Sequence, residues 1–176
     1  MSGHGDGVRR LVVLRHAQAE HGSMSDELRP LTLHGRRQSA GVGAALGAAG
    51  LLPETVLVST AVRARQTWEI LRSAMGDVPQ PEVVLADALY DASPGDVTAM
   101  VRALDARVRT VLVVGHEPTM SGLATVLASP QTSVTEALSR VHAGLHTAAY
   151  AVLEIAVWAD LAPGSALLRE VVRPAR

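Results

Sequence analysis

Apolar runs of strand length alternate along the chain with longer stretches of helical period. The early runs are LVVL (11–14), TVLVS (55–59), EVVL (82–85) and TVLVVG (110–115). This alternation predicts an α/β domain with a mostly parallel central sheet and helices on both faces, which makes three layers. The near-continuous apolar character of these strands predicts that both of their faces are buried.

Helix termini are signalled by particular residues. A helix is expected from about Leu33 and should stop near Gly50, because glycine favours the position that follows a helix. Ser93 and Pro94 predict the N-cap and first helical position of a later helix. The other expected elements are a helix over about 62–75, short helices at 120–127 and 135–141, and late strands at 148–155 and 166–172.

Composition indicates one globular domain. The chain has 176 residues, of which 48% are hydrophobic and 19% charged. We expect residues 8–173 to fold as a unit after a flexible Gly-rich start at 1–7.

A net charge of -1 provides no field that would attract nucleic acid or an anionic membrane. No apolar run approaches the roughly 20 residues of a membrane span, and no secretory signal is evident, so a cytoplasmic location is expected.

Two absences narrow the chemistry. The chain contains no cysteine, which excludes disulfides and thiolate zinc sites. Lysine is absent as well, so neither a lysine Schiff base nor a P-loop lysine is available. All sixteen basic residues other than histidine are arginines, and arginine must therefore supply any cationic recognition.

Charged and titratable side chains follow three of the predicted strands. Arg15 and His16 come directly after the first strand, Arg63 lies in the first turn after the second within STAVRARQT, and His116 follows the fourth within GHEP. Ligands of parallel sheets bind beyond the carboxyl ends of the strands. We therefore expect these four residues to meet at one edge of the sheet.

This set suits a phosphoryl group. Arginine offers a planar fork of donors that matches phosphate oxygens, and helix N-termini favour an anion. A neutral imidazole can attack phosphorus with one ring nitrogen while a hydrogen bond holds the other. We predict a phosphate pocket of Arg15, Arg63 and His116 around His16, the attacking group. Gln18 either binds a phosphate oxygen or only closes the loop.

The motifs LRHAQAE, SxxxRxxQT (59–67) and GHEP, in this order, resemble the histidine phosphatase superfamily. The RHA form, PLTLHGRRQ (30–38) and the tail WADLAPGSALL are most similar to the SixA-type phosphohistidine phosphatase branch. The resemblance spans about 8–173 and implies a phosphoglycerate mutase-like fold. It also implies that His16 is transiently phosphorylated and that no metal or organic cofactor takes part.

Other readings of the polar residues are less favoured. A metal site at His16 and His116 would suffer repulsion from the adjacent arginines. Arg65 is expected to be a solvated or salt-bridging residue outside the pocket. Four histidines without a motif are expected on the surface, and a fifth lies in the Gly-rich start: His21, His34, His142, His146 and His4.

The chain departs from the family pattern in two places. Where mutase-like members carry a glutamate, this chain has ALYDAS, so Asp91 is either the general acid or only helps to start the helix near Pro94. An alkoxide leaving group needs a proton, whereas the imidazole that leaves a phosphohistidine is far less demanding. In GLHTAAY (144–150), only Thr147 remains of an aromatic-proline-threonine element that is usual in SixA-like relatives.

We interpret the chain as a metal-independent phosphohydrolase whose substrate is a phosphohistidine protein, since a short chain leaves little sequence for a lid over a small molecule. Residues 129–147 could still form a cover. One alternative is a phosphatase of small phosphate esters with Asp91 as the acid, while a mutase matches less well. A non-catalytic phosphate-binding module is the third alternative, although such a module has no need to keep His16.

Overall fold

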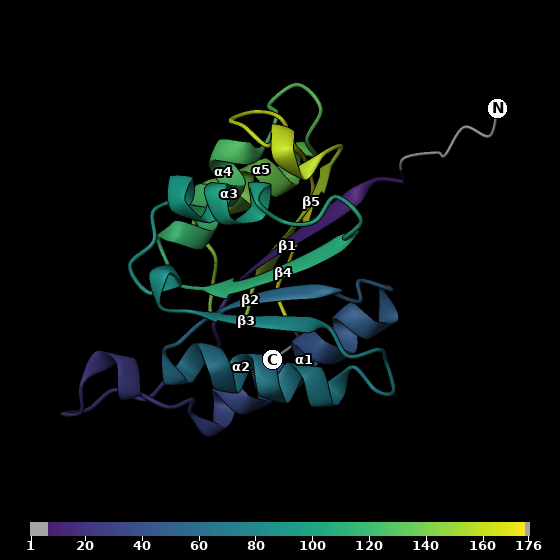
Figure 1. Ribbon diagram of the computed structural model, residues 1–176. Coiled ribbons are helices and arrows are strands. Elements are labelled where there is room, and N and C mark those ends of the chain that lie inside the picture. The colour runs from purple at the N-terminus through teal and green to yellow at the C-terminus, as the bar shows by residue number, and fades with distance from the viewer. Residues whose placement is uncertain (1–6, 175–176) are drawn as a thin grey trace.

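The central sheet has six strands in the order β3-β2-β4-β1-β5-β6 in the computed structural model, which describes residues 7–174 (Figure 1). The first four strands along the chain run parallel, and β5 and β6 are antiparallel to their neighbours. The predicted segment 1–7 lies outside the described residues except for Gly7. The strands are β1 (Arg9–Arg15), β2 (Thr55–Ser59), β3 (Glu82–Ala86), β4 (Thr110–Gly115), β5 (Tyr150–Ile155) and β6 (Leu167–Val172).

Helices cover both faces of the sheet, which confirms the predicted three-layer α/β/α fold. Figure 1 shows α1 and α2 on one face and α3, α4 and α5 on the other. Strand β1 alternates between the two cores, with Leu11 and Val13 facing the α3–α5 layer and Val12 and Leu14 facing α1 and α2. The helices are α1 (Leu33–Ala48), α2 (Val62–Ala74), α3 (Pro94–Arg102), α4 (Thr119–Leu127) and α5 (Thr135–His142), with short 3-10 turns η1 (Asp26–Leu28), η2 (Asp87–Leu89) and η3 (Trp158–Asp160).

The predicted helix ends are confirmed by the backbone conformation at Gly50 and by the hydrogen bonds at Ser93. Gly50 follows α1 with a φ of +68°, the left-handed conformation that glycine adopts without strain. Ser93 and Asp96 form a capping box at the start of α3, in which each side chain binds the other residue's backbone N–H. None of the helices in the described part of the chain is long and apolar enough to cross a membrane.

One burial prediction is wrong. Strands β1, β2 and β4 are buried on both faces as expected, but in β3 Val83, Val84 and Leu85 are 42%, 37% and 53% exposed. Strand β3 is the last strand on its side of the sheet and pairs only with β2. The apolar sequence of this edge strand resembles that of a central strand. Fewer neighbouring elements pack on an edge strand, however, so its side chains stay partly exposed.

The sheet order places the functional strand ends side by side. Strand β4 lies between β1 and β2 and pairs with both in parallel, so that Arg15 pairs with Gly115. At the same edge β5 begins and β6 ends, because Tyr150 pairs with Leu14 on one side and Val172 on the other. The prediction that the residues after β1, β2 and β4 emerge from one edge is therefore confirmed.

Candidate active site

His16 follows β1 directly, and the residue is 9% exposed. Nδ1 lies 2.7 Å from the carbonyl oxygen of Ala17, and Nε2 accepts a hydrogen bond from Arg63 Nε at 3.3 Å. Because a carbonyl only accepts and a guanidinium only donates, the ring proton is on Nδ1. Burial, followed by the charges of neighbouring groups, lowers the pKa of His16 to about 3, although the bond to Ala17 opposes this. His16 is therefore neutral and has a lone pair on Nε2.

His116 occupies the corresponding position after β4. Its Nε2 lies 2.7 Å from Ser59 Oγ at the end of β2, and its Nδ1 lies 3.4 Å from a terminal nitrogen of Arg63. Arginine only donates, so Nδ1 accepts and the Nε2–H donates to Ser59. Burial first, and then the Arg63 charge, lower the pKa of His116 to about 4. The rings of His16 and His116 are 5.2 Å apart between centroids.

Arg63 lies in the first turn of α2 and is 5% exposed. Besides its contacts with both imidazoles, its terminal nitrogens donate to the Asp26 carbonyl oxygen at 2.7 Å and to Asp26 Oδ2 at 2.9 Å. Thr67, one turn later, accepts from the Ala17 N–H and donates to the Arg63 carbonyl. These bonds fix the start of α2 against the loop that follows His16.

Arg15 completes the cationic part of the site. It is half-buried and donates to the Leu145 carbonyl oxygen at 2.9 Å. Glu117, the glutamate of GHEP, holds the same segment, since its carboxylate accepts from the Leu145 N–H at 3.2 Å and from the Ser121 N–H at 2.8 Å. The Arg15 charge also contributes to the lowered pKa of both site histidines.

Two residues of the site, Asp26 and Tyr90, were not predicted. The Asp26 carboxylate accepts hydrogen bonds from the Tyr90 hydroxyl and from a terminal nitrogen of Arg63 at 2.9 Å. It also accepts from Arg29, at 2.7 Å from a terminal nitrogen and 2.9 Å from Nε. These bonds, that of Tyr90 first, hold the pKa of Asp26 well below its usual range, so the carboxylate stays ionised. The Tyr90 ring stands edge-on to His116, with centroids 5.5 Å apart.

The sequence gives only a partial signal for these two residues. Asp26 lies in the polar stretch EHGSMSDELR, which follows no strand directly and contains no motif. Tyr90 belongs to ALYDAS (88–93), which follows the third strand and includes the end of η2. The strand-end rule points to this segment, where Tyr90 rather than its neighbour Asp91 contacts the other site residues.

Two predicted site residues lie apart from the cluster. Asp91 is exposed, and within residues 7–174 no hydrogen bond or ion pair joins it to the other site residues. The side-chain oxygen of Gln18 accepts from Thr32 Oγ1 at 2.9 Å, and its carbonyl accepts from the Thr32 N–H, so Gln18 supports the start of α1. The structure thus brings together the four residues predicted from the strand ends and leaves these two outside.

Other motif residues hold the backbone of the pocket. Gln66 Oε1 accepts from the Leu31 N–H at 2.8 Å. Gln38 Oε1 accepts from the Gln18 N–H at 3.0 Å, and its amide nitrogen donates to Thr147 Oγ1 at 3.1 Å. The two glutamines therefore connect the loop after β1 to both helices on that face and to the segment before β5.

The segment 129–147 packs on the face of the sheet that α4 covers and along β6, rather than over His16. The backbone N–H groups of Ser129 and Val134 donate to carbonyls next to and within β6, and only the end of the segment reaches the site, through Leu145. Arg65 is half-buried outside the cluster. The predicted surface histidines are exposed as expected: His21, His34, His142 and His146.

The chemistry of the cluster suits an anion, and the Nε2 lone pair of His16 is a group that can act as a nucleophile. Two neutral imidazoles and two arginines lie together at the carboxyl ends of neighbouring strands. Such a set suits a tetrahedral oxyanion such as a phosphoryl group. Within the residues that the structure describes, no group of three or more His, Asp or Glu side chains is placed to hold a metal ion.

This fold and this site define a phosphatase with a phosphoglycerate mutase-like architecture. A model of the histidine phosphatase superfamily (branch 1) matches residues 11–151. The match covers most of the chain, and the chain belongs to this superfamily.

Relatives and solved structures agree with this assignment. A protein of Mycobacterium tuberculosis (strain ATCC 25618 / H37Rv) is 40% identical over 157 residues, which make up 88% of this chain and 96% of the relative. Phosphohistidine phosphatase SixA of Escherichia coli (strain K12) is 32% identical over 124 residues, covering 70% of this chain and 76% of SixA.

Solved structures of similar fold include SixA proteins. A protein assigned as the phosphohistidine phosphatase SixA of Nakamurella multipartitia has a TM-score of 0.80 at 34% identity, covering 97% of this chain and 98% of that chain. The protein histidine phosphatase SixA in complex with tungstate has a TM-score of 0.76 at 26% identity, covering 94% and 97%.

Proposed function

We propose that the chain is a protein phosphohistidine phosphatase that works without a metal ion and uses His16 as its nucleophile. The observation that carries this proposal is the state of His16, a neutral buried ring with a lone pair on Nε2 beside the Arg63 guanidinium. A nucleophile in this state is ready to attack at neutral pH without prior loss of a proton.

In the first step His16 Nε2 attacks phosphorus. The P–N bond of the substrate breaks, and its electron pair goes to the leaving imidazole nitrogen. Arg15 and Arg63 neutralise charge on the oxygens of the transferred group, which is the main source of catalysis in phosphoryl transfer. His116, which is neutral, turns its Nε2–H from Ser59 Oγ to one of these oxygens. Arg63 Nε, which donates to His16 Nε2 in the free enzyme, turns its hydrogen bond to a phosphoryl oxygen.

In the second step water attacks phosphorus of the phosphorylated His16. The P–Nε2 bond breaks, Nε2 recovers its lone pair, and inorganic phosphate leaves. The hydrogen bond from Nδ1–H to the Ala17 carbonyl stabilises the ring while Nε2 carries the phosphoryl group. The sum of both steps is the hydrolysis of one P–N bond by one water molecule.

The carboxylates around the site favour a phosphohistidine over a phosphate ester. Asp26 is held ionised by its donors and has no proton to give. No carboxyl group in residues 7–174 hydrogen-bonds to either site imidazole. A leaving imidazole requires far less protonation than a leaving alkoxide, so the proton-donor chemistry of this site suits a P–N bond.

Comparisons support the same substrate class. The SixA structure with tungstate holds a tetrahedral oxyanion, a kind of group that the N–H donors of Arg15 and Arg63 are suited to bind. The Escherichia coli relative is a phosphohistidine phosphatase. We therefore assign a phosphorylated protein as the substrate and a small phosphate ester as the alternative.

The test compares rates on a histidine-phosphotransfer domain phosphorylated chemically with phosphoramidate and on a panel of small phosphate esters. The wild type should hydrolyse the phosphohistidine protein much faster than any ester. It should also acquire an acid-labile, alkali-stable label from 32P-phosphohistidine, whereas His16→Ala should lose both turnover and label.

His142→Ala serves as the matched control, because His142 is exposed on α5 and should leave rate and label unchanged. Faster turnover of esters would favour the small-molecule alternative. Phosphate binding without turnover by the wild type would instead identify a binding module.

A further inference from the structure

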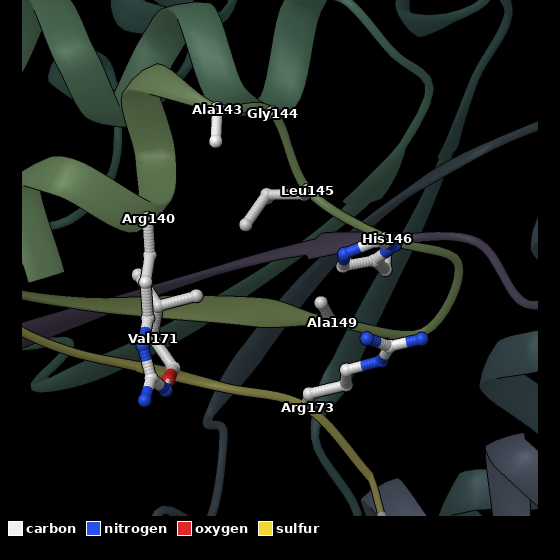
Figure 2. A pocket seen from close by; sticks show the side chains of 8 residues that line it. All are labelled: Arg140, Ala143, Gly144, Leu145, His146, Ala149, Val171 and Arg173. Carbon is white, nitrogen blue, oxygen red and sulfur yellow. Dashed lines mark hydrogen bonds between the residues drawn. The ribbon is translucent and has the colours of Figure 1, made fainter.

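A cavity of about 370 Å³ lies beside the active site, between the segment before β5 and the end of β6 (Figure 2). Leu145, Ala149 and Val171 provide its apolar lining. The charged and titratable residues that line it are all basic, namely Arg140, His146 and Arg173. The cavity therefore combines an apolar floor with cationic donors.

The cavity shares a wall with the phosphate pocket. Strand β6 ends at the same sheet edge as β1, so Arg173 belongs to the edge on which His16 lies. Leu145 lines the cavity, while its carbonyl oxygen accepts from Arg15 at 2.9 Å. Only the backbone at Leu145 would thus separate a molecule in the cavity from Arg15, one of the proposed phosphate ligands.

Two of the basic side chains are free to bind a ligand. Arg140 donates to the Val171 carbonyl at 2.9 Å and to Glu136 at 2.6 Å, so its charge is already compensated. For His146 and Arg173, both exposed, the structure gives no side-chain hydrogen bond or ion pair with any residue between 7 and 174. Figure 2 shows the imidazole of His146 and the guanidinium of Arg173 at the same end of the cavity, away from Arg140.

The opposite side of the active site carries the opposite charge. Asp87 and Asp91, on the β3 side, are both exposed. Two carboxylates therefore lie beside β3, and the cavity beside β6 is lined by basic residues, with the phosphate pocket between them; Glu170 of β6 lies outside that lining. An acidic segment of a bound protein would be repelled from the first side and attracted to the second.

We propose that this cavity binds an acidic segment of the protein substrate, next to the phosphohistidine that enters the active site. The inference rests on the proposed function. Carboxylates of the segment accept hydrogen bonds from Arg173 and His146, and the methylene groups of a glutamate pack on the apolar floor. The site would fix the orientation of the substrate and raise its affinity without touching the reacting atoms.

The test uses two synthetic phosphohistidine peptides that differ only in having Glu or Gln at the flanking positions. The wild type should show a kcat/KM about tenfold higher for the Glu peptide, through KM, because charge-assisted hydrogen bonds at a partly exposed site contribute at this scale. A variant with Arg173→Gln and His146→Gln should lose this preference and hydrolyse free phosphohistidine at the wild-type rate. Arg10→Gln, an exposed arginine at the opposite end of β1, should keep the preference.

An unchanged preference in the double variant would overturn the inference. A loss of activity toward free phosphohistidine would overturn it too, because the residues would then serve the pocket itself. If the wild type hydrolyses no phosphohistidine, the proposed function fails, and the cavity is tested by fluorescence anisotropy with the unphosphorylated peptides. Weaker binding of the Glu peptide by the double variant than by the wild type would support the docking site, whereas equal binding would reject it.

Discussion

At the scale of single residues, Arg63 is the point where the parts of the site meet. Its guanidinium contacts both imidazoles and Asp26, and it would also have to bind the phosphoryl group. Asp26 is held in turn by Tyr90 and Arg29. The orientation of Arg63 in the free enzyme thus depends on a carboxylate and a hydroxyl that never carry phosphate.

Tyr90→Phe tests this dependence. The substitution removes the hydroxyl that donates to Asp26 and keeps the ring beside His116. We expect kcat/KM on a phosphohistidine protein to fall about fivefold, since one hydrogen bond to a charged group is lost at a partly exposed site. Steady-state kinetics together with a thermal melt close to that of the wild type would show that positioning rather than folding is affected. An unchanged kcat/KM would remove Tyr90 from the site.

Asp91→Asn tests the predicted general acid. Asp91 is exposed and lies outside the hydrogen-bonded cluster, so phosphohistidine hydrolysis should stay within about twofold of the wild-type rate. Asp77→Asn, at an exposed position before β3, controls for the loss of one surface charge. If ester hydrolysis by the Asp91 variant dropped by orders of magnitude while the control stayed active, Asp91 would be the acid for esters.

At the scale of elements, α1 and α2 pack so closely that a glycine is required between them. A Cβ at Gly43 would lie 2.1 Å from the Leu71 carbonyl oxygen and 2.9 Å from the Ala74 Cβ. Gly41, on the same helix, is exposed, and a Cβ there would meet only Pro174 at 3.6 Å. There is therefore room for a side chain at Gly41 and none at Gly43.

Alanine substitutions should separate them. Gly41→Ala should raise the free energy of unfolding by about 0.5–1 kcal/mol through helix propensity. Gly43→Ala gains the same propensity, but overpacking against the α2 backbone should cost about 1–3 kcal/mol and leave a net loss. Urea denaturation measures both values, and a stabilised Gly43 variant would show that the helices separate at no cost.

Element types could be predicted from the sequence because period and caps are local signals. The apolar runs, Gly50 and the Ser93 cap each identified their element correctly. The order of the strands is not local, and it decides what a strand buries. EVVL in β3 has the composition of a central strand, and only its pairing with β2 alone makes it exposed.

At the scale of the whole molecule, the difference between local signals and non-local strand order explains which site residues could be predicted. Arg15, His16, Arg63 and His116 could be predicted because each follows a strand, and the strand ends of a parallel sheet converge. Asp26 reaches Arg63 from a loop that no rule places. Tyr90 could be narrowed to a short segment but not to a residue, because the direction of a side chain depends on the fold of η2.

The two buried imidazoles make stability depend on pH. Both are neutral in the folded protein, with pKa values of about 3 for His16 and about 4 for His116 against an ordinary value of 6.5. The unfolded chain therefore binds more protons, and stability falls as the pH drops below 6.5 toward these values. From pH 7 to pH 5 each ring should cost about 2 kcal/mol.

His16→Gln keeps a neutral polar side chain and removes one of these groups. Its free energy of unfolding should therefore fall by about 2 kcal/mol less than that of the wild type between pH 7 and pH 5. Denaturation at the two pH values measures the difference. Equal losses in the variant and the wild type would mean that the His16 ring is already charged in the folded protein at pH 5.

The position of β1 in the sheet has a consequence for biosynthesis. The strand that precedes His16 is synthesised before the other strands of the sheet, yet its two neighbours, β4 and β5, follow it by about 100 residues or more. A nascent chain that ends before Gly115 lacks His116, and one that ends before Tyr150 leaves one side of β1 unpaired. Phosphatase activity should therefore appear abruptly, only once β5 has been synthesised, so that a shorter nascent chain removes no phosphoryl group from its substrate.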